Sequence, residues 1–384
     1  MSYNGTALIH SQFATSRRSR VPLALGVAVL AACIAPVTTA WSQTPPADPL
    51  VKEGATVAVA RHTWVIPDGD VGLVPNVGII VGSRGVLVID PGLGRRNGET
   101  VLREVAKVAA GRPLFVATTH FHAEHTTGVL AFPPSATYIN SNTQEGEYAA
   151  GGAQLIATFA KRSPATADLL AGATQRTANV TFDGTYRLDL GDVHVQFMVV
   201  GPAHTRGDTV FFVEEDRVLF TGDVVMNNSF VAAGAAASMR AWLAAFDRFD
   251  ALKPAVVVPS HGAVGAASLI ATCREFMEAI RTRAAELKAA GTSADDTAAQ
   301  VQKELQAAHP TWPRANGIAA AARSAYAEAS SDDAAIRGIV QDEIAAWTQE
   351  TPWRTPVTSP QTAPSPTSRA SSSRATTRVS SNTR

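Results

Sequence analysis

The densest group of chemically versatile side chains is the segment His120-Phe121-His122-Ala123-Glu124-His125. It follows directly on the apolar residues 114–119, which have the composition of a buried strand. A histidine at a strand end and a second one two residues later can direct both rings toward one point. Glu124 and His125 then begin a turn or helix that can face the same point from the other side. Imidazole nitrogens and carboxylate oxygens are ligands that zinc prefers, so the segment predicts a metal site, with a run of surface histidines as the alternative.

Three later segments repeat the order of apolar strand, polar residue and glycine. His204, Asp223 and His261 each follow an apolar run, and each has a glycine close by. Ligands of open sheets bind where the strands end, and glycine there allows sharp bends and close approach of the backbone. Any one of these side chains alone could be a hydrogen-bonded core residue, but the repeated arrangement favours a common site.

Taken together, these motifs resemble those of the metallo-β-lactamase-fold superfamily of metal-dependent hydrolases. The pattern of that superfamily is His-x-His-x-Asp-His, followed by a lone His, a bridging Asp and a final His. The matching residues, in chain order, are His120, His122, Glu124, His125, His204, Asp223 and His261. The resemblance covers residues 55–290 and implies an α/β fold, a four-layer αββα sandwich with metals at one edge between the sheets.

The resemblance also implies a site for two metal ions per chain, zinc first, with iron or manganese as alternatives. One ion would take His120, His122 and His204, the other would take His125, His261 and Glu124, and Asp223 would bridge them. Two such ions about 3.5–4 Å apart share a hydroxide that attacks a bond polarised by the metals. Asp90 would orient a ligand histidine through its far ring nitrogen, although an ordinary Asp-Pro-Gly turn is the alternative for this residue.

Two positions carry information about the branch of the superfamily. Glu124 stands where most members have Asp, and the longer side chain requires the backbone to retreat or the second metal site to change. Asp223 is an acidic bridge, which lactam-cleaving members generally lack. It therefore favours the thioesterase, lactonase, sulfatase and phosphodiesterase branches, and it is also a candidate for moving a proton during turnover.

The predicted function is hydrolysis of an ester, lactone, thioester or related bond in a small molecule by a metal-bound hydroxide. The alternatives are a β-lactam hydrolase, an iron-dependent oxygenase on the same fold, and a non-catalytic binding protein on this scaffold. The formal net charge is zero and the chain has no basic stripe, which argues against a nucleic-acid partner. Pocket walls are expected from residues 64–75, 148–161 and 226–236, and Asn227 and Asn228 suggest a roomy, weakly charged pocket.

The N-terminal residues read as a targeting segment. Arg17, Arg18 and Arg20 precede an apolar run, and small residues near position 40 offer cleavage sites, so residues 1–42 are predicted to be a signal peptide for the periplasm or secretion. Leu-Ala-Ala-Cys at Cys33 resembles a lipoprotein box; plain cleavage is favoured, and lipidation at Cys33 would be the chain's only attachment to a membrane. Cys273 then has no disulfide partner, and its helical apolar spacing places it in the core.

Strands that alternate with helices predict a layered α/β domain over residues 55–290. Strands are expected at 76–81, 85–90, 136–140, 181–190, 193–200, 209–214, 217–220 and 255–259, with helices near 98–110, 143–161, 239–249 and beyond 265. Residues 291–350 predict a helical extension that packs on the core, with a dimer contact as the alternative. Residues 351–384 are Ser, Thr, Pro and Arg with few apolar side chains, which predicts a disordered tail.

Overall fold

The computed structural model describes residues 47–234 and 236–329. The predicted signal peptide with Cys33, the last part of the helical extension and the predicted tail lie outside these residues and stay predictions. Among the described residues, no helix combines the length and the apolar character needed to cross a membrane.

The first sheet has seven strands in the order β1-β2-β3-β4-β5-β6-β7. Neighbouring strands from β1 to β4 are antiparallel, and those from β4 to β7 are parallel. The strands are β1 (Val57–Ala58), β2 (Thr63–Ile66), β3 (Val77–Val81), β4 (Val86–Ile89), β5 (Leu114–Ala117), β6 (Thr137–Ser141) and β7 (Val180–Phe182).

The second sheet has five strands in the order β12-β11-β10-β9-β8. Only β11 and β12 are parallel neighbours, so β9, which pairs antiparallel with β10, runs in the same direction as β11 and β12. The strands are β8 (Thr185–Asp189), β9 (His194–Val199), β10 (Thr209–Val213), β11 (Val218–Gly222) and β12 (Val256–Pro259).

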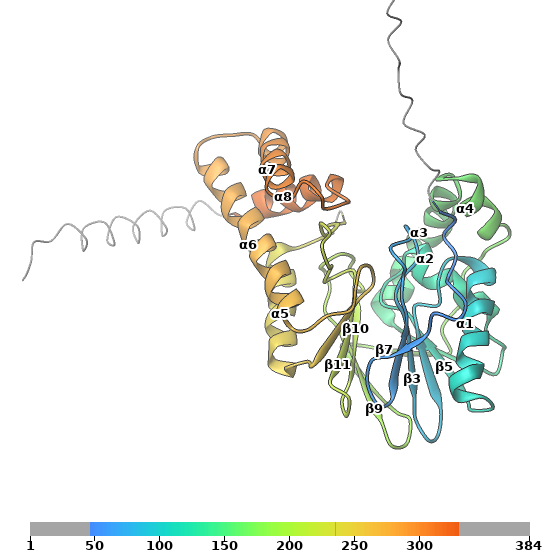
Figure 1. Cartoon of the computed structure of the whole chain (residues 1–384). Coiled ribbons are helices and arrows are strands. Elements are labelled where there is room, and N and C mark those ends of the chain that lie inside the picture. The colour runs from blue at the N-terminus through green and yellow to red at the C-terminus, as the bar shows by residue number, and fades with distance from the viewer. Residues whose placement is uncertain (1–46, 235, 330–384) are drawn as a thin grey trace, which may run out of the picture. The chain divides into compact units, whose positions relative to one another are not determined.

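Helices cover the outer faces of both sheets, and Figure 1 shows the sheets between α1 on one side and α5 and α6 on the other. The helices are α1 (Gly94–Ala109), α2 (Ala123–Thr126), η1 (Thr127–Ala131), α3 (Asn142–Ala160), α4 (Pro164–Leu169), α5 (Met239–Leu252), α6 (Ser268–Ala289), α7 (Ala294–Ala308) and α8 (Asn316–Glu328). The predicted four-layer αββα sandwich with C-terminal helices is confirmed.

The apolar runs of the strands follow from burial on both faces. In β4, Leu87 and Ile89 point into the core between the sheets, whereas Val86 and Val88 pack toward α1. In β10, Phe211 lies between the sheets and Phe212 packs on the side of α5 and α6. Because side chains alternate along a strand, a strand covered on both sides must be apolar throughout.

One predicted element is wrong. Residues 181–190 were expected to form a single strand, but they form β7 and β8, which belong to different sheets. Gly184 lies between them with a φ of 63°, so the chain turns there and crosses from one sheet to the other. Apolar and polar residues continue to alternate through the turn, so the sequence of this segment resembles that of one continuous strand.

The helical extension packs on the core. Trp312 in the loop between α7 and α8 stacks on His309 with ring centroids 4.1 Å apart and contacts Phe230 at 5.4 Å. Pro313 accepts a hydrogen bond from the backbone N–H of Phe230. Cys273 is buried in α6, as its apolar spacing predicts. The extension therefore lies against the loop after β11, close to the edge where the strands end.

Candidate metal centre

The seven predicted ligand residues come from strand ends at one edge of the two sheets. His120 follows β5, His204 follows β9, Asp223 follows β11 and His261 follows β12. His122 lies at the N-terminus of α2, which carries Glu124 and His125. A hydrogen bond from the backbone N–H of Thr209 to the carbonyl of Thr119 joins the two sheets at this edge. The strands of both sheets that carry these residues end at this edge, and their loops therefore meet.

The structure brings these side chains into two adjoining clusters. His120, His122 and His204 present ligand atoms that all lie within 4.8 Å of one another, and so do Glu124, His125 and His261. Nε2 of His204 lies 3.2 Å from Nδ1 of His122. Two nitrogens bound to one tetrahedral zinc at about 2.0–2.1 Å would lie roughly 3.3–3.4 Å apart. This pair of nitrogens in the first cluster therefore already has nearly the spacing that zinc requires.

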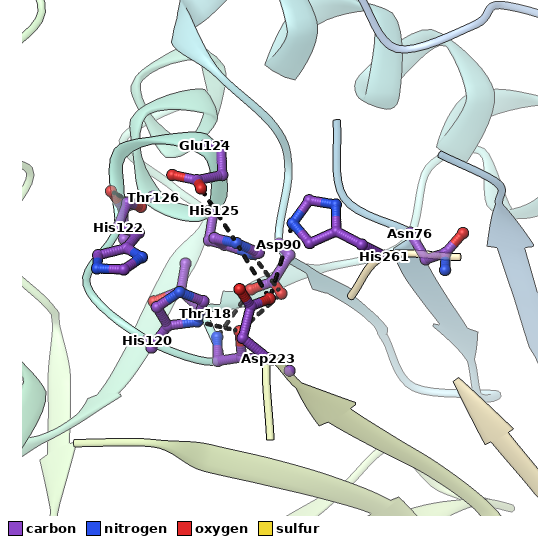
Figure 2. Close-up of polar contacts among 12 residues, drawn as sticks. Asn76, Asp90, Thr118, His120, His122, Glu124, His125, Thr126, Asp223 and His261 are labelled. Atoms are coloured by element: carbon purple, nitrogen blue, oxygen red, sulfur yellow. Dashed lines mark hydrogen bonds and ion pairs between the residues drawn. The ribbon is translucent and has the colours of Figure 1, made fainter. Parts of the chain in front are cut away.

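Asp223 lies between the clusters, as Figure 2 shows. Its Oδ2 lies 3.6 Å from Nε2 of His204, whereas its Oδ1 lies 3.7 Å from Nε2 of His261 and 3.8 Å from Nε2 of His125. One oxygen thus faces each cluster. This is the geometry that a carboxylate needs to bridge two cations.

The buried donor atoms fit a metal. Several of them have no hydrogen-bond partner within the described residues: Nε2 of His120, His125 and His261, Oδ1 of Asp223 and Oε2 of Glu124. A buried polar atom without a partner costs free energy, and such atoms are rare in folded proteins. Cations bound in the two clusters would give these nitrogens and oxygens the partners that they lack.

A comparison with known families agrees with this geometry. The sequence profile of the Metallo-beta-lactamase superfamily matches residues 70–261, half of the 384-residue chain. The chain belongs to the metallo-beta-lactamase superfamily. The match begins before β3 and ends at His261, so it contains all seven residues of the centre but not the C-terminal helices.

Two relatives with assigned activities are thioesterases. The human acyl-coenzyme A thioesterase MBLAC2 is 28% identical over 172 residues, which cover 41% of this chain and 60% of that protein. The atrochrysone carboxyl ACP thioesterase of Aspergillus fumigatus is 25% identical over 190 residues, which cover 49% of this chain and 38% of that protein. The chain therefore matches only part of the length of either superfamily relative.

A solved structure shares the superfamily fold over a larger part of the chain. The stereoselective inverting sec-alkylsulfatase of a Pseudomonas species superposes with a TM-score of 0.54, covering 76% of this chain and 57% of its own. The two sequences are 15% identical over this match. This likeness concerns the fold alone.

Three of the cluster histidines, His120, His125 and His204, have a partner on the ring nitrogen that faces away from the clusters. Nδ1 of His125 lies 3.0 Å from Oδ2 of Asp90, which the sequence analysis expected to orient a ligand. Nδ1 of His120 lies 3.0 Å from the hydroxyl of Thr119. Nδ1 of His204 contacts the carbonyl oxygen of Ala232. Such partners fix the tautomer and direct the remaining nitrogen toward a metal.

Burial keeps most of the imidazoles neutral. It lowers the pKa of His120 and of His122 well below the usual value for histidine, and neighbouring histidines add to the effect. Burial also lowers the pKa of His261 to about 3, against the attraction of Asp223. A metal binds the neutral imidazole, so these rings are ready for a cation without losing a proton.

The acidic side chains supply the negative charge that would balance a bound cation. Burial opposes ionisation of Asp223, but the nearby His261, His204 and His125 outweigh it and hold the pKa of this carboxyl below its usual range. Burial raises the pKa of Glu124. The ionised Asp223 is therefore better suited to hold a cation than to accept a proton.

Two buried side chains that were not among the predicted site residues hold the ligand loops. Asp208 accepts hydrogen bonds from the backbone N–H and the hydroxyl of Thr205, which closes the turn that presents His204. Asn76 donates from its side chain to the carbonyl oxygens of Pro259 and Gly262 on either side of His261. Buried Asn and Asp side chains of this kind commonly stabilise turns, but their sequence neighbours did not reveal which turn.

A cavity of about 500 Å³ opens beside His261. Two of the predicted wall segments contribute to it, through residues 68, 70–72 and 227–229, but residues 148–161 do not. The expectation of a weakly charged pocket is wrong, because Asp68, Asp70 and Arg314 also line the cavity. Arg314 comes from the loop between α7 and α8, beyond the matched part of the superfamily.

Proposed function

We propose that this protein is a metal-dependent hydrolase that cleaves thioesters of small molecules. The observation that carries the proposal is the position of Asp223, which directs one carboxylate oxygen at each of two histidine clusters. The thioester is favoured because the two curated relatives described above are thioesterases. The acidic bridge at Asp223 favours the same branch over lactam cleavage.

The proposed cations are two zinc ions, chosen because the donors are imidazoles and carboxylates. One would be held by His120, His122 and His204, the other by Glu124, His125 and His261, with Asp223 between them. When bound, such ions lower the pKa of a water molecule toward about 7 and polarise a carbonyl oxygen.

The side chains and backbone around the clusters orient the ligand rings and shield one side of the centre from water. Thr119, Asp90 and Ala232 hold ligand rings in place through their second nitrogens. Buried His120 and His125 seal the inner side of the centre, and the cavity beside His261 leaves the other side open to a substrate. A substrate carbonyl would therefore approach the centre from the side of this cavity.

The test is turnover by the purified, zinc-loaded full chain on a panel of thioesters, esters, lactones, sulfate esters, phosphodiesters and β-lactams. We expect release of thiol at rates above those on the other substrates, and a zinc content near two per chain. Asp223→Ala should lower kcat/KM by about 100-fold or more, because it removes the carboxylate that directs one oxygen at each cluster. Activity confined to phosphodiesters or β-lactams would overturn the choice of thioesters, and a folded protein that binds no divalent metal would overturn the whole proposal.

A further inference from the structure

The C-terminal helices place Arg314 beside the candidate metal centre. It lies between α7 and α8 with a φ of 69°, and its side chain is 31% exposed. Nη1 of Arg314 lies 3.7 Å from Oδ2 of Asp223, and the residue lines the cavity together with His261. A guanidinium therefore lies at the mouth of the proposed reaction site.

The positive charge of Arg314 has no dedicated partner among residues 47–234 and 236–329. Its guanidinium forms one ion pair there, with Asp223, and no hydrogen bond to a protein atom. That carboxylate is also the one that faces both histidine clusters. By contrast, Arg283 forms two close hydrogen bonds with Glu304. A cation bound by Asp223 would leave Arg314 without a counter-charge.

The two other charged residues of the cavity do not supply that charge. Asp68 forms no ion pair with Arg314 in the described part of the chain; instead, its two oxygens each accept a hydrogen bond from a backbone N–H, that of Asp70 and that of Gly262. Asp70 lines the same cavity, but no ion pair joins it to Arg314. The donors of the guanidinium therefore remain available to a molecule in the cavity.

The loop that carries Arg314 is firmly seated. The carbonyl of Pro313 accepts hydrogen bonds from the backbone of Phe230 at 3.2 Å and from the hydroxyl of Ser229 at 3.5 Å. Gly317 lies so close to the backbone of Ala232 that an added Cβ would meet its Cα at 2.8 Å. The arginine is thus presented on a fixed backbone, and little entropy is lost when it binds a ligand.

We propose that Arg314 is a specificity residue that binds an anionic group of the substrate, a carboxylate, sulfonate or phosphate, close to the scissile bond. The planar guanidinium matches the two oxygens of such groups. Because Arg314 lies next to Asp223, the anionic group must be only a few bonds from the reacting carbonyl. The inference rests on the proposed thioester hydrolysis, and it narrows the substrate to short thioesters that carry a negative charge on the acyl or the thiol side.

Three thioesters test whether the anionic group lies on the acyl side or on the thiol side of the scissile bond. S-butyryl-N-acetylcysteamine is neutral, S-butyryl-3-mercaptopropionate has a carboxylate on the thiol side, and S-succinyl-N-acetylcysteamine has one on the acyl side. Each is tested with the zinc-loaded wild type, Arg314→Gln, Arg314→Lys and the control Arg323→Gln. Arg323 is a matched control because it is an arginine of α8 that pairs with Asp295 and does not line the cavity.

We expect one of the anionic thioesters to exceed the neutral one in kcat/KM by about 10- to 100-fold, the range of a charge-assisted hydrogen bond. Arg314→Gln should abolish this preference mainly through KM, so that its loss of kcat/KM is at least about 10-fold greater on the preferred anionic thioester than on the neutral one. Arg314→Lys should keep part of the preference, and Arg323→Gln all of it. An equal loss on all three thioesters would overturn the inference, because Arg314 would then act on the metal centre through Asp223.

A binding measurement separates this inference from the proposed function. The zinc-loaded proteins are titrated by calorimetry with the unreactive thioethers 3-(butylthio)propanoate and 4-(ethylthio)butanoate. We expect Arg314→Gln to weaken binding of one of them by about 10-fold or more. If wild type hydrolyses no thioester, the proposed function fails, but this titration still decides the role of Arg314. Equal affinities of wild type and Arg314→Gln for both thioethers would overturn that role.

Discussion

Oδ2 of Asp90 lies 3.0 Å from Nδ1 of His125, and the same carboxylate accepts hydrogen bonds from the backbone and the hydroxyl of Thr119. This carboxylate therefore orients a ring of the second cluster and supports the segment that leads into His120. It also helps to raise the pKa of His125 to about 9 against the effect of burial. The first prediction follows from this position.

Asp90→Asn should weaken zinc binding about 10- to 100-fold, because the amide cannot supply the negative charge that orients and strengthens the donor ring. Asn tolerates the φ of 55° found at this position, so the backbone should persist. Titration with a competing chelator measures the affinity. Unchanged affinity would show that His125 is oriented without Asp90.

Glu124 is the residue that departs from the usual aspartate, and its Oε1 lies 4.0 Å from Nε2 of His125. We expect Glu124→Gln to lower the zinc content from two ions to one, because the first cluster does not include this side chain. Glu124→Asp should keep a carboxylate but lose reach, so its second zinc should bind more weakly than in wild type. Metal analysis after dialysis measures both; two tightly held zinc ions in Glu124→Gln would remove this residue from the ligand set.

Removal of the metals should lower the thermal stability of the protein. The cluster buries several polar atoms that have no protein partner within the described residues, and a bound cation satisfies them. Zinc at about 1,000 times its Kd contributes about 4 kcal/mol to the free energy of unfolding, which corresponds to a Tm shift on the order of 10 °C in a domain of this size. Calorimetric melts with chelator and with added zinc measure the shift. Identical melts would argue against metal binding in the folded state.

Gly317→Ala should move α8 away from the segment of Val231 and Ala232, and the carbonyl of Ala232 orients His204. The new Cβ would meet the Cα of Ala232 and the carbonyl of Val231 at 2.8 Å, so the backbone must shift. We expect a loss of about 1–3 kcal/mol in the free energy of unfolding, measured by urea denaturation, together with weaker zinc binding through His204.

Gly146→Ala is the matched control for Gly317→Ala. Gly146 also lies in a helix, α3, and an added Cβ there meets nothing within 4 Å. The free energy of unfolding of this control should rise by about 0.5–1 kcal/mol, because alanine favours the helix more than glycine does. A stable Gly317→Ala protein with normal zinc affinity would contradict the coupling.

The strand-end chemistry was readable from the sequence because it depends on local order. An apolar strand followed by His120, His204, Asp223 or His261 places each side chain at a strand exit, and parallel strands bring their exits to one edge. Asp90 also ends an apolar run, but its role as a partner of a ligand histidine was predicted from the family resemblance. The assignment of these positions to a metal centre drew on the resemblance of their combined pattern to a family.

Other features depended on contacts between segments far apart in the chain. Residues 181–190 divide between two sheets because Phe182 completes one sheet and Thr185 begins the other, and their alternating pattern is the same in both. The carbonyl of Ala232 orients His204 without any side-chain signal. Arg314 stands in no motif, and long-range contacts such as the packing of Trp312 and Pro313 on Phe230 bring it to Asp223. Local patterns could therefore indicate the candidate metal ligands, because their chemistry depends on residue type, whereas the charge of the pocket depends on long-range packing that no single segment encodes.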